Sequence, residues 1–327
     1  MKCFWPGRLA IAALALAAGA ASAQPSFPIK PVTLIVPFAA GGPNDVMSRI
    51  VAEHMSRTFG QPILIENVAG AGGTTGSARV AVSQPDGYTL LSGHVGTHAA
   101  APALYPKLRY NPLTDFSPIG LVAETPILVA TRHSLQVDTL QAFVSLAKQK
   151  DADLTLGHAG VGSIGHISCL LLSKTIEIKP TEVPYRGSAP AMIDLIAGRS
   201  DYTCALLVDV LPFIGSASLK FLAVSAPARV PQLPSTPTAA EAGMPEFRAS
   251  SWFAFYLPKA TPDSIRDRFV AALDSALSDP AVRKRFVDSG LVLPAPDMLG
   301  PAPLKQLMIE ETARWSDIIR SARITAE

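Results

Sequence analysis

The chain has 327 residues, a formal net charge of +2 and 48% hydrophobic residues. Because this net charge is close to zero and the sequence has neither a basic tract nor an acidic tail, nucleic acid and membrane surfaces are not expected as partners. A chain of this length can form two domains, each with its own core.

The first 23 residues have the pattern of a secretory signal peptide. Lys2 and Arg8 flank the start, the apolar run LAIAALALAAGAA follows, and Ala21-Ser22-Ala23 is an A-x-A cleavage site. The apolar run is shorter than the roughly 20 residues that span a bilayer, so cleavage after Ala23 is favoured over a membrane anchor. No later apolar run approaches that length, which predicts a soluble exported protein.

Cleavage would leave two cysteines, Cys169 and Cys204, because Cys3 lies within the signal peptide. An oxidising compartment allows one disulfide between them. We nevertheless interpret them as two buried free thiols.

Short β-branched or leucine-rich runs alternate with helical patterns along the mature chain. Strands are predicted at 32–38, 62–68, 88–93, 127–131, 153–159, 181–185, near 200–207 and at 220–226. Helices are predicted at 45–58, through 78–81, at 138–149, about 165–175, 188–197, 263–278 and 303–322. This alternation predicts an α/β fold with a largely parallel sheet and helices on both of its faces.

Two stretches have the composition of connections, one near 124–126 and one at 226–234. They predict two lobes, with residues 24–125 and 227–327 in lobe 1 and residues 126–226 in lobe 2. Two lobes that are joined by crossing segments enclose a cleft and can close on a ligand by hinge motion.

Four strand-to-helix turns are rich in Gly, Ser and Thr, at 39–45, 70–76, 93–97 and 160–166. In α/β proteins, ligands bind beyond the carboxyl ends of parallel strands, where such turns lie. Unpaired N–H groups at helix starts receive anions. None of these turns contains Lys or Arg, so we expect backbone N–H groups and hydroxyls to hold an anion from both lobes.

Two kinds of enzyme fit single features of these turns. GVGSIG at 160–165 matches a dinucleotide-binding motif, but the acidic residue expected about 20 positions later is only loosely matched by Glu182. A secreted hydrolase is the alternative to a binding protein, because serines, histidines, Asp45 and Asp209 are available. No G-x-S-x-G elbow surrounds Ser163 or any other serine, which favours a helix-capping role for Ser163.

His94 and His98 are four residues apart, but Gly96 between them argues against a regular helix face for zinc. Hydrogen bonding to a ligand or a structural role in the loop is favoured for these histidines. We therefore expect neither a metal nor a cofactor. For Asp45, we expect a structural role at the start of its helix, where a carboxylate stabilises the unpaired N–H groups.

The stretch IKPVTLIVPFAAGGPNDVMSRIVAEHMSRTFGQPILIENVAGAGGTTGSARVAVSQPDGYTLL resembles the opening of Bug-type (TctC-like) solute-binding proteins of tripartite tricarboxylate transporters. The resemblance continues through GVGSIGH, Val183 to Gly187, Pro234 to Gly243 and Ser251 to Phe253, and so covers the mature chain. It implies a type 2 periplasmic binding fold with two doubly wound lobes and a ligand cleft between them. It also implies a periplasmic receptor without enzymatic activity, which captures a small di- or tricarboxylate and delivers it to membrane permease subunits. We expect a monomer.

The resemblance assigns ligand binding to the four loops and to one tyrosine. The candidate ligand-binding residues are Phe38, Ala39, Ala40, Gly41, Asn44, Asp45, Gly72, Gly73, Gly96, Thr97, His98, Gly162, Ser163, Gly165, His166 and Tyr185.

The chain departs from the family pattern at Ala101, at Ala205-Leu206 and at His158-Ala159, where polar or small hydroxyl residues are common in the family. These departures predict a less polar wall, and hence an aliphatic or aromatic dicarboxylate rather than a hydroxylated tricarboxylate such as citrate. If His98 or His158 lines the site, affinity is expected to rise as the pH falls through about 6.5.

Overall fold

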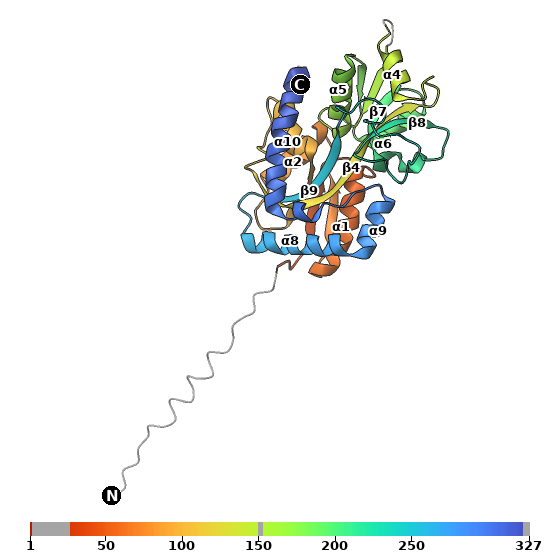
Figure 1. Cartoon of the computed structure of the whole chain (residues 1–327). Helices are drawn as coiled ribbons and strands as arrows, with labels where there is room; N and C mark the ends of the chain where they lie inside the picture. Colours follow the sequence, from red (N-terminus) through yellow and green to blue (C-terminus); the bar gives the residue numbers. More distant parts are fainter. Residues whose placement is uncertain (2–26, 150–152, 323–327) are drawn as a thin grey trace.

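The computed structural model describes Met1, residues 27–149 and residues 153–322 (Figure 1). Apart from Met1, the predicted signal peptide lies outside the described residues. Within the part of the chain that is described, no helix is both long enough and apolar enough to cross a bilayer.

The strands of the described residues form one continuous sheet. They are β1 (Val32–Val36), β2 (Ile63–Asn67), β3 (Thr89–His94), β4 (Phe116–Arg132), β5 (Thr155–His158), β6 (Thr181–Pro184), β7 (Tyr202–Leu206), β8 (Leu219–Ser225) and β9 (Ser250–Pro258). Their order is β2-β1-β3-β9-β4-β7-β5-β6, and β8 also pairs with β4.

The helices surround this sheet (Figure 1). They are α1 (Pro43–Phe59), α2 (Thr74–Ala81), α3 (Ala101–Leu104), α4 (Leu140–Ala147), α5 (Ile164–Ile176), α6 (Ser188–Ile196), α7 (Leu207–Val210), α8 (Asp263–Ser278), α9 (Pro280–Asp288) and α10 (Pro301–Ala322). We call β1–β3 with α1–α3 and α8–α10 lobe 1, and β5–β8 with α4–α7 lobe 2.

The expectation of a largely parallel sheet holds at the two ends of the sheet and is wrong at its centre. β1 pairs in parallel with β2 and β3, and β5 with β6 and β7. β9 instead runs antiparallel to β3 and β4, and β4 runs antiparallel to β7 and β8. The long strand β4 includes Pro118, Gly120 and Pro126, which break the local strand pattern, so only its second half was predicted.

β4 and β9 are the two strands that join the lobes (Figure 1). They pair from Phe116 with Pro258 to Pro126 with Ser250, and β4 then continues beside β7 and β8. Before β9 begins, the chain still contacts β8, because the Ala239 N–H donates to the Val224 carbonyl (2.8 Å). The two connections between the lobes, β4 and β9, are therefore strands of one sheet. The lobe boundaries predicted from the sequence, at residues 125/126 and 226/227, remain a prediction.

The helices predicted from apolar periodicity are present, with boundaries shifted by a few residues at most. α9 was not predicted, because only Val282 and Phe286 are buried in this charged nine-residue helix. Its start is nevertheless well defined by Asp279, whose carboxylate accepts hydrogen bonds from the N–H groups of Ala281 (2.7 Å) and Val282 (3.1 Å).

Cys169 in α5 and Cys204 in β7 form a disulfide, with their Cα atoms 5.4 Å apart. The interpretation as two free thiols is therefore wrong. The two residues are 35 positions apart in the sequence, and only the packing of α5 against β7 brings them together. The disulfide fixes the start of α5 to the strand behind it.

Candidate functional site

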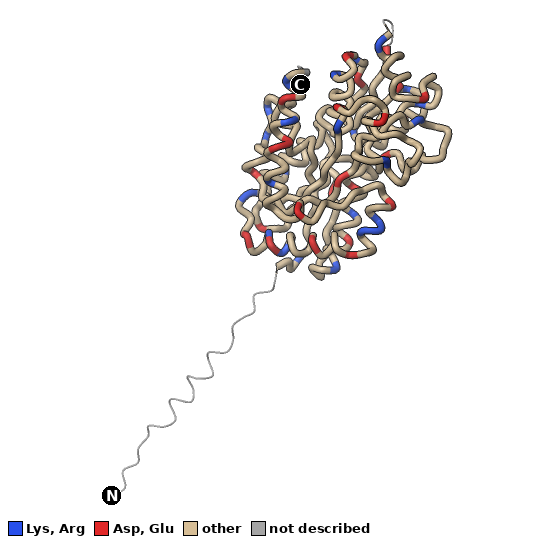
Figure 2. Tube along the Cα trace, viewed as in Figure 1, with Lys and Arg blue, Asp and Glu red and all other residues tan. Residues whose placement is uncertain are grey.

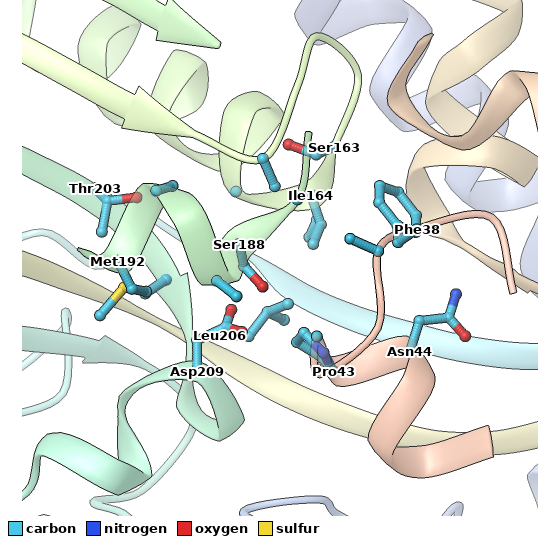
Figure 3. Close-up of a pocket in the computed structure, with 18 of the residues that line it drawn as sticks. Phe38, Pro43, Asn44, Ser163, Ile164, Ser188, Met192, Thr203, Leu206 and Asp209 are labelled. Carbon is cyan, nitrogen blue, oxygen red and sulfur yellow. The ribbon is translucent and has the colours of Figure 1, made fainter. Parts of the chain in front are cut away.

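A cleft with an empty volume of about 690 Å³, its mouth included, lies between the two lobes (Figure 3). Lobe 1 contributes the loop after β1, the start of α1 and His94, and β9 contributes Phe253. The lining from lobe 2 consists of Ala159, Ser163, Ile164, Gly165, Gly187, Ser188, Ala189, Ala191, Met192, Thr203, Cys204, Ala205, Leu206 and Asp209.

The lobe 1 wall is built by the abrupt turn from β1 into α1. Gly41 takes a positive φ of 84°, which glycine tolerates, and Pro43 occupies the first turn of the helix. The first intrahelical bond is donated by the Val46 N–H to the Gly42 carbonyl (2.9 Å), so the N–H groups of Asn44 and Asp45 precede it. This end of α1 therefore offers backbone donors and a partial positive charge to the cleft.

The polar side chains at this helix start are occupied by protein partners. Asn44 donates to the Ser92 carbonyl (3.0 Å), which connects α1 to β3. Asp45 accepts hydrogen bonds from the Gly41 N–H (3.0 Å) and from Arg49 (2.8 and 2.9 Å). Burial acts to raise the pKa of Asp45, but the hydrogen bonds from Arg49 and Gly41 outweigh it and lower the pKa overall. Asp45 thus supports the turn, as the sequence predicted.

Lobe 2 presents two further helix starts to the cleft. Ser163 caps α5 by accepting a hydrogen bond from the His166 N–H (3.3 Å), as its sequence position predicted. The N–H groups of Ile164 and Gly165 precede the first intrahelical bond, which Ile167 donates. α6 begins after Gly187, close to α1, because a Cβ on Gly42 would lie 3.4 Å from the Ser188 hydroxyl. Three helix starts therefore face one cleft.

His94 lies in the cleft wall between Phe38 and Phe253, with ring centroids 4.8 and 6.4 Å away. Burial lowers its pKa to about 3, so the imidazole is neutral near pH 7. Its Nδ1 accepts a hydrogen bond from the Gly96 N–H (2.7 Å), which places the ring proton on Nε2. Nε2 is buried and has no partner within the described residues, so this N–H of His94 has no hydrogen-bond acceptor there.

Asp209 is the charged side chain among the residues that line the cleft. Figure 3 shows its carboxyl group beside Ser188 and Leu206. Burial raises its pKa to about 7, although hydrogen bonds with the Ser188 side chain and the Leu206 backbone act in the opposite direction. Figure 2 shows the other charged residues mostly on the outside of the molecule, with both signs interspersed.

Six of the predicted site residues line the cleft: Phe38, Ala39, Ala40, Asn44, Ser163 and Gly165. Three predicted glycines instead allow close packing next to it. A Cβ on Gly72 would lie 2.0 Å from the Val161 carbonyl oxygen, and one on Gly96 would lie 2.4 Å from the Gly162 carbonyl oxygen. Gly73 has φ 92° and packs against Thr97 and Phe38. Gly72 and Gly96 thus allow the loops of the two lobes to touch.

Thr97 and His98 are completely buried behind the cleft. His98 stacks on Tyr256, with ring centroids 4.0 Å apart, and its Nδ1 is 2.8 Å from the Thr97 hydroxyl. Burial holds the pKa of His98 well below its usual value. Neither His98 nor His158 lines the cleft, so the predicted route to pH-dependent binding through these histidines does not apply.

His166 and Tyr185 also direct their side chains away from the cleft. His166 Nε2 is 3.1 Å from the Glu182 carboxylate, and Tyr185 donates to Asp194 (2.8 Å). His158, His166 and Glu182 bring three potential metal-ligand atoms together. The Gly162 N–H donates to His166 Nδ1 (3.1 Å), which leaves the ring proton on Nε2. This tautomer suits a hydrogen bond to Glu182 rather than a metal bond at Nε2.

The sequence prediction did not include several residues that line the cleft, among them His94, Ser188, Met192, Asp209 and Phe253. A signal existed for Ser188, because Arg186-Gly187-Ser188 precedes a predicted helix in the same way as the other turns. For His94 and Asp209, the sequence showed only that each lies at or after the end of a predicted strand, which does not indicate that its side chain reaches the cleft.

A larger hollow of about 1730 Å³ lies elsewhere, beside α2. Its lining comes from residues 71–82 and 105–109, all in lobe 1. Arg79, Lys107 and Arg109 line it. The interlobe cleft is the better candidate site, because both lobes and three helix starts contribute to it.

Comparisons with known proteins identify the family of the chain. Residues 47–324 match the model of the tripartite tricarboxylate transporter family receptor. A protein encoded in the TAR-I ttuE-ttuC′ intergenic region of Agrobacterium vitis is 43% identical over 302 residues, which covers 92% of this chain and 87% of the relative.

Two solved structures from Rhodopseudomonas palustris have the same fold. MatC with bound malate is 42% identical, with a TM-score of 0.86 over 90% of this chain and 100% of its own. A second protein, solved with adipate, is 32% identical, with a TM-score of 0.87 over 92% of this chain and 100% of its own. The chain thus belongs to the TctC family of tripartite tricarboxylate transporter receptors, which are periplasmic solute-binding proteins.

Proposed function

We propose that this protein is a periplasmic receptor that captures a small dicarboxylate in the cleft and delivers it to the membrane subunits of a tripartite tricarboxylate transporter. The observation that carries the proposal is the convergence of the α1, α5 and α6 starts and the neutral His94 ring on one cleft whose lining contains neither Lys nor Arg. Backbone donors of this kind match the charge of a carboxylate without a cationic side chain.

The lining of the cleft favours a ligand with two charged ends separated by an apolar middle. The helix starts lie on opposite walls, while Ile164, Met192 and Leu206 provide apolar surface between them (Figure 3). Malate and adipate, which the two R. palustris structures contain, are both aliphatic dicarboxylates. An aliphatic dicarboxylate is therefore the ligand class that we propose.

Closure of the two lobes is part of the proposal. The loops at Gly72 and Gly96 contact the 160–162 loop, and the Tyr105 hydroxyl donates to the Val161 carbonyl. β4 and β9 are the connections about which the lobes would rotate. We expect ligand to favour this contact, and small-angle scattering should show a more compact protein with saturating ligand. If scattering shows no compaction, hinge closure would be contradicted, but ligand binding in the cleft would not.

Among the described residues around Ser163, the contacts do not favour the hydrolase alternative. The Ser163 hydroxyl is engaged as a helix cap, and the ring of its neighbour His166 contacts Gly162 and Glu182. A receptor should bind its ligand reversibly and release it unchanged.

Isothermal titration calorimetry with malate, succinate, adipate and citrate tests the proposal, with the diamide of succinate as the uncharged control. We expect saturable binding of at least one dicarboxylate and no binding of the diamide. Chromatography of the recovered ligand should show no product. Preference for the diamide, or product formation, would overturn the receptor assignment for this cleft.

A matched pair of variants tests the role of His94. His94→Phe removes the Nε2–H donor, and we expect about a tenfold loss of affinity, the usual effect of losing one hydrogen bond to a charged group. His94→Gln keeps a side-chain donor and should recover part of the loss. Equal affinities for wild type and His94→Phe would remove His94 from the site.

A further inference from the structure

The charge of Asp209 is opposite to the one that a carboxylate site requires. Three helix starts make the cleft attractive to anions, and yet its one charged lining residue is an acid. An ionised Asp209 would repel a ligand carboxylate, and the apolar neighbours Met192 and Leu206 would screen this repulsion poorly. Binding of a dicarboxylate that fills the cleft therefore requires that Asp209 lose its negative charge.

We propose that Asp209 binds the ligand as a neutral carboxylic acid, so that the protein takes up one proton from solvent when a dicarboxylate enters the cleft. This inference rests on the proposed function. The Asp209 O–H would donate to a ligand carboxylate oxygen, which converts a repulsive pair of acids into a hydrogen bond. The Asp209 carboxylate gains an O–H bond to a proton that water or a buffer acid releases, and no other covalent bond changes.

The surroundings of Asp209 favour the neutral form. Burial in the wall raises its pKa to about 7, and no charged group contributes to this shift. Ser188 on α6 and the Leu206 backbone provide polar contacts. A dianionic ligand in the cleft would raise the pKa further, because a nearby negative charge disfavours the carboxylate.

The other elements that line the cleft supply no competing proton acceptor near pH 7. The start of α1 contributes Pro43 and Asn44, the start of α5 contributes Ser163 and Gly165, and β7 contributes Thr203 to Leu206. The remaining titratable lining group is His94 on β3, which stays neutral because its pKa is about 3. Asp45 at the start of α1 is paired with Arg49 and does not line the cleft.

The sign of the pH dependence follows. Below the pKa of the free Asp209, the binding form is already present, and affinity is constant. Above it, each ligand must be accompanied by a proton, so affinity falls by about tenfold per pH unit. Between pH 6.5 and pH 8.5, with a pKa of about 7, we expect about a 25-fold weaker affinity for malate or adipate. Both probes are fully ionised in this range, so their own titration does not contribute.

The test is calorimetric titration of the wild type with malate and adipate at both pH values, each in two buffers of different ionisation enthalpy. The difference between buffers reports proton uptake, which should approach one proton per ligand at pH 8.5. Asp209→Asn keeps a side-chain donor without the charge, so it should bind with a pH-independent affinity, release or take up no proton, and exceed the wild type at pH 8.5.

Ser188→Ala provides a second check. The Ser188 hydrogen bond lowers the pKa of Asp209, so its removal should move the loss of affinity to higher pH. Equal wild-type affinities at the two pH values without proton uptake would overturn the inference, as would an unchanged pH dependence in Asp209→Asn. If Asp209→Asn does not fold, proton uptake by the wild type decides alone. A failure of every dicarboxylate to bind at pH 6.5 would instead count against the proposed function itself.

Discussion

The two walls of the cleft are stabilised in different ways. Behind the lobe 1 wall lies a buried polar layer. In it, the Asn44 side chain donates to the Ser92 carbonyl, and the Thr97 hydroxyl contacts both the His94 N–H and His98 Nδ1. The lobe 2 wall instead has a disulfide at its back, between Cys169 and Cys204, and its one charged group is an acid without a cationic partner.

This difference separates two tasks. The lobe 1 wall uses its polar side chains to hold its own backbone in place, and so offers the ligand fixed N–H donors that suit carboxylates in general. The lobe 2 wall exposes side chains such as Ser188, Met192 and Asp209, whose identity can distinguish one carboxylate from another. Reduction should therefore weaken lobe 2. Acid should weaken lobe 1 through the buried His94 and His98, and should also act on lobe 2 through His158, whose pKa burial lowers to about 4.

The largest effect is expected from removal of the disulfide. The double variant Cys169→Ala with Cys204→Ala should lower the free energy of unfolding by about 2–4 kcal/mol, because the unfolded chain loses its cross-link. Urea unfolding measures the loss. Reductant should produce a similar loss in the wild type and none in the variant. If the wild type in reductant unfolds at the same urea concentration as without it, lobe 2 does not depend on this bond.

Acid should act through the buried histidines. Because the pKa of His98 in the folded protein lies well below the value of the unfolded chain, the unfolded state binds protons first as the pH falls below about 6.5. Its contribution to stability is complete above that pH and should decrease by about 1.4 kcal/mol per pH unit below it.

His98→Phe keeps an aromatic ring against Tyr256 and cannot bind a proton. We expect its free energy of unfolding to fall less steeply than that of the wild type between pH 6.5 and pH 5, by about 2 kcal/mol over this range. Urea unfolding at each pH measures the slopes. Equal slopes for the two proteins would mean that burial does not keep His98 unprotonated in the folded protein.

Contact between the walls should depend on Gly72. A Cβ at this position would lie 2.0 Å from the Val161 carbonyl oxygen, so Gly72→Ala should separate the loops and lower ligand affinity by about tenfold, or about 1.4 kcal/mol. Gly60→Ala is the matched control, because Gly60 also has a positive φ, does not line the cleft, and a Cβ there would meet no atom within 4 Å. Equal losses of affinity in the two variants would indicate backbone strain rather than contact between lobes.

The smallest effect is expected at Asp45. Asp45→Asn loses its ion pair with Arg49 and should lower the free energy of unfolding by about 1 kcal/mol at pH 7. Because its pKa is lowered in the folded protein, this contribution is present above about pH 4 and disappears as the pH falls through the folded pKa. Asp288→Asn removes an exposed pair with Lys284 and should change stability less. The opposite order would contradict a supporting role for Asp45.

Much of the fold could be predicted from the sequence, because short-range patterns determine it. The apolar face of α1, Pro43 at its start and the glycine-rich turn before it are all local features, and the turn that they predicted lines the candidate cleft. The central strand pairings were not predictable in this way, since β4 contains prolines and glycine and becomes a strand through its long-range pairing with β9.

The parts of the site that were missed depend on tertiary neighbours. The ring proton of His94 lies on Nε2 because the Gly96 N–H occupies its other ring nitrogen, and the pKa of Asp209 is raised because the folded chain desolvates its carboxyl group. His98, in contrast, was assigned to the ligand, although its stacking on Tyr256 places it in the core. A histidine in a glycine-rich loop does not reveal from sequence alone which way its ring will face.

A crystal structure of the protein with malate or adipate, grown at about pH 6.5, where His94 is neutral, tests the central claim most directly. The account predicts carboxylate oxygens within about 3 Å of helix-start N–H groups such as those of Asn44 and Gly165, and of His94 Nε2. A dicarboxylate bound outside the interlobe cleft, for example beside Arg79 and Lys107 in the hollow on lobe 1, would contradict it.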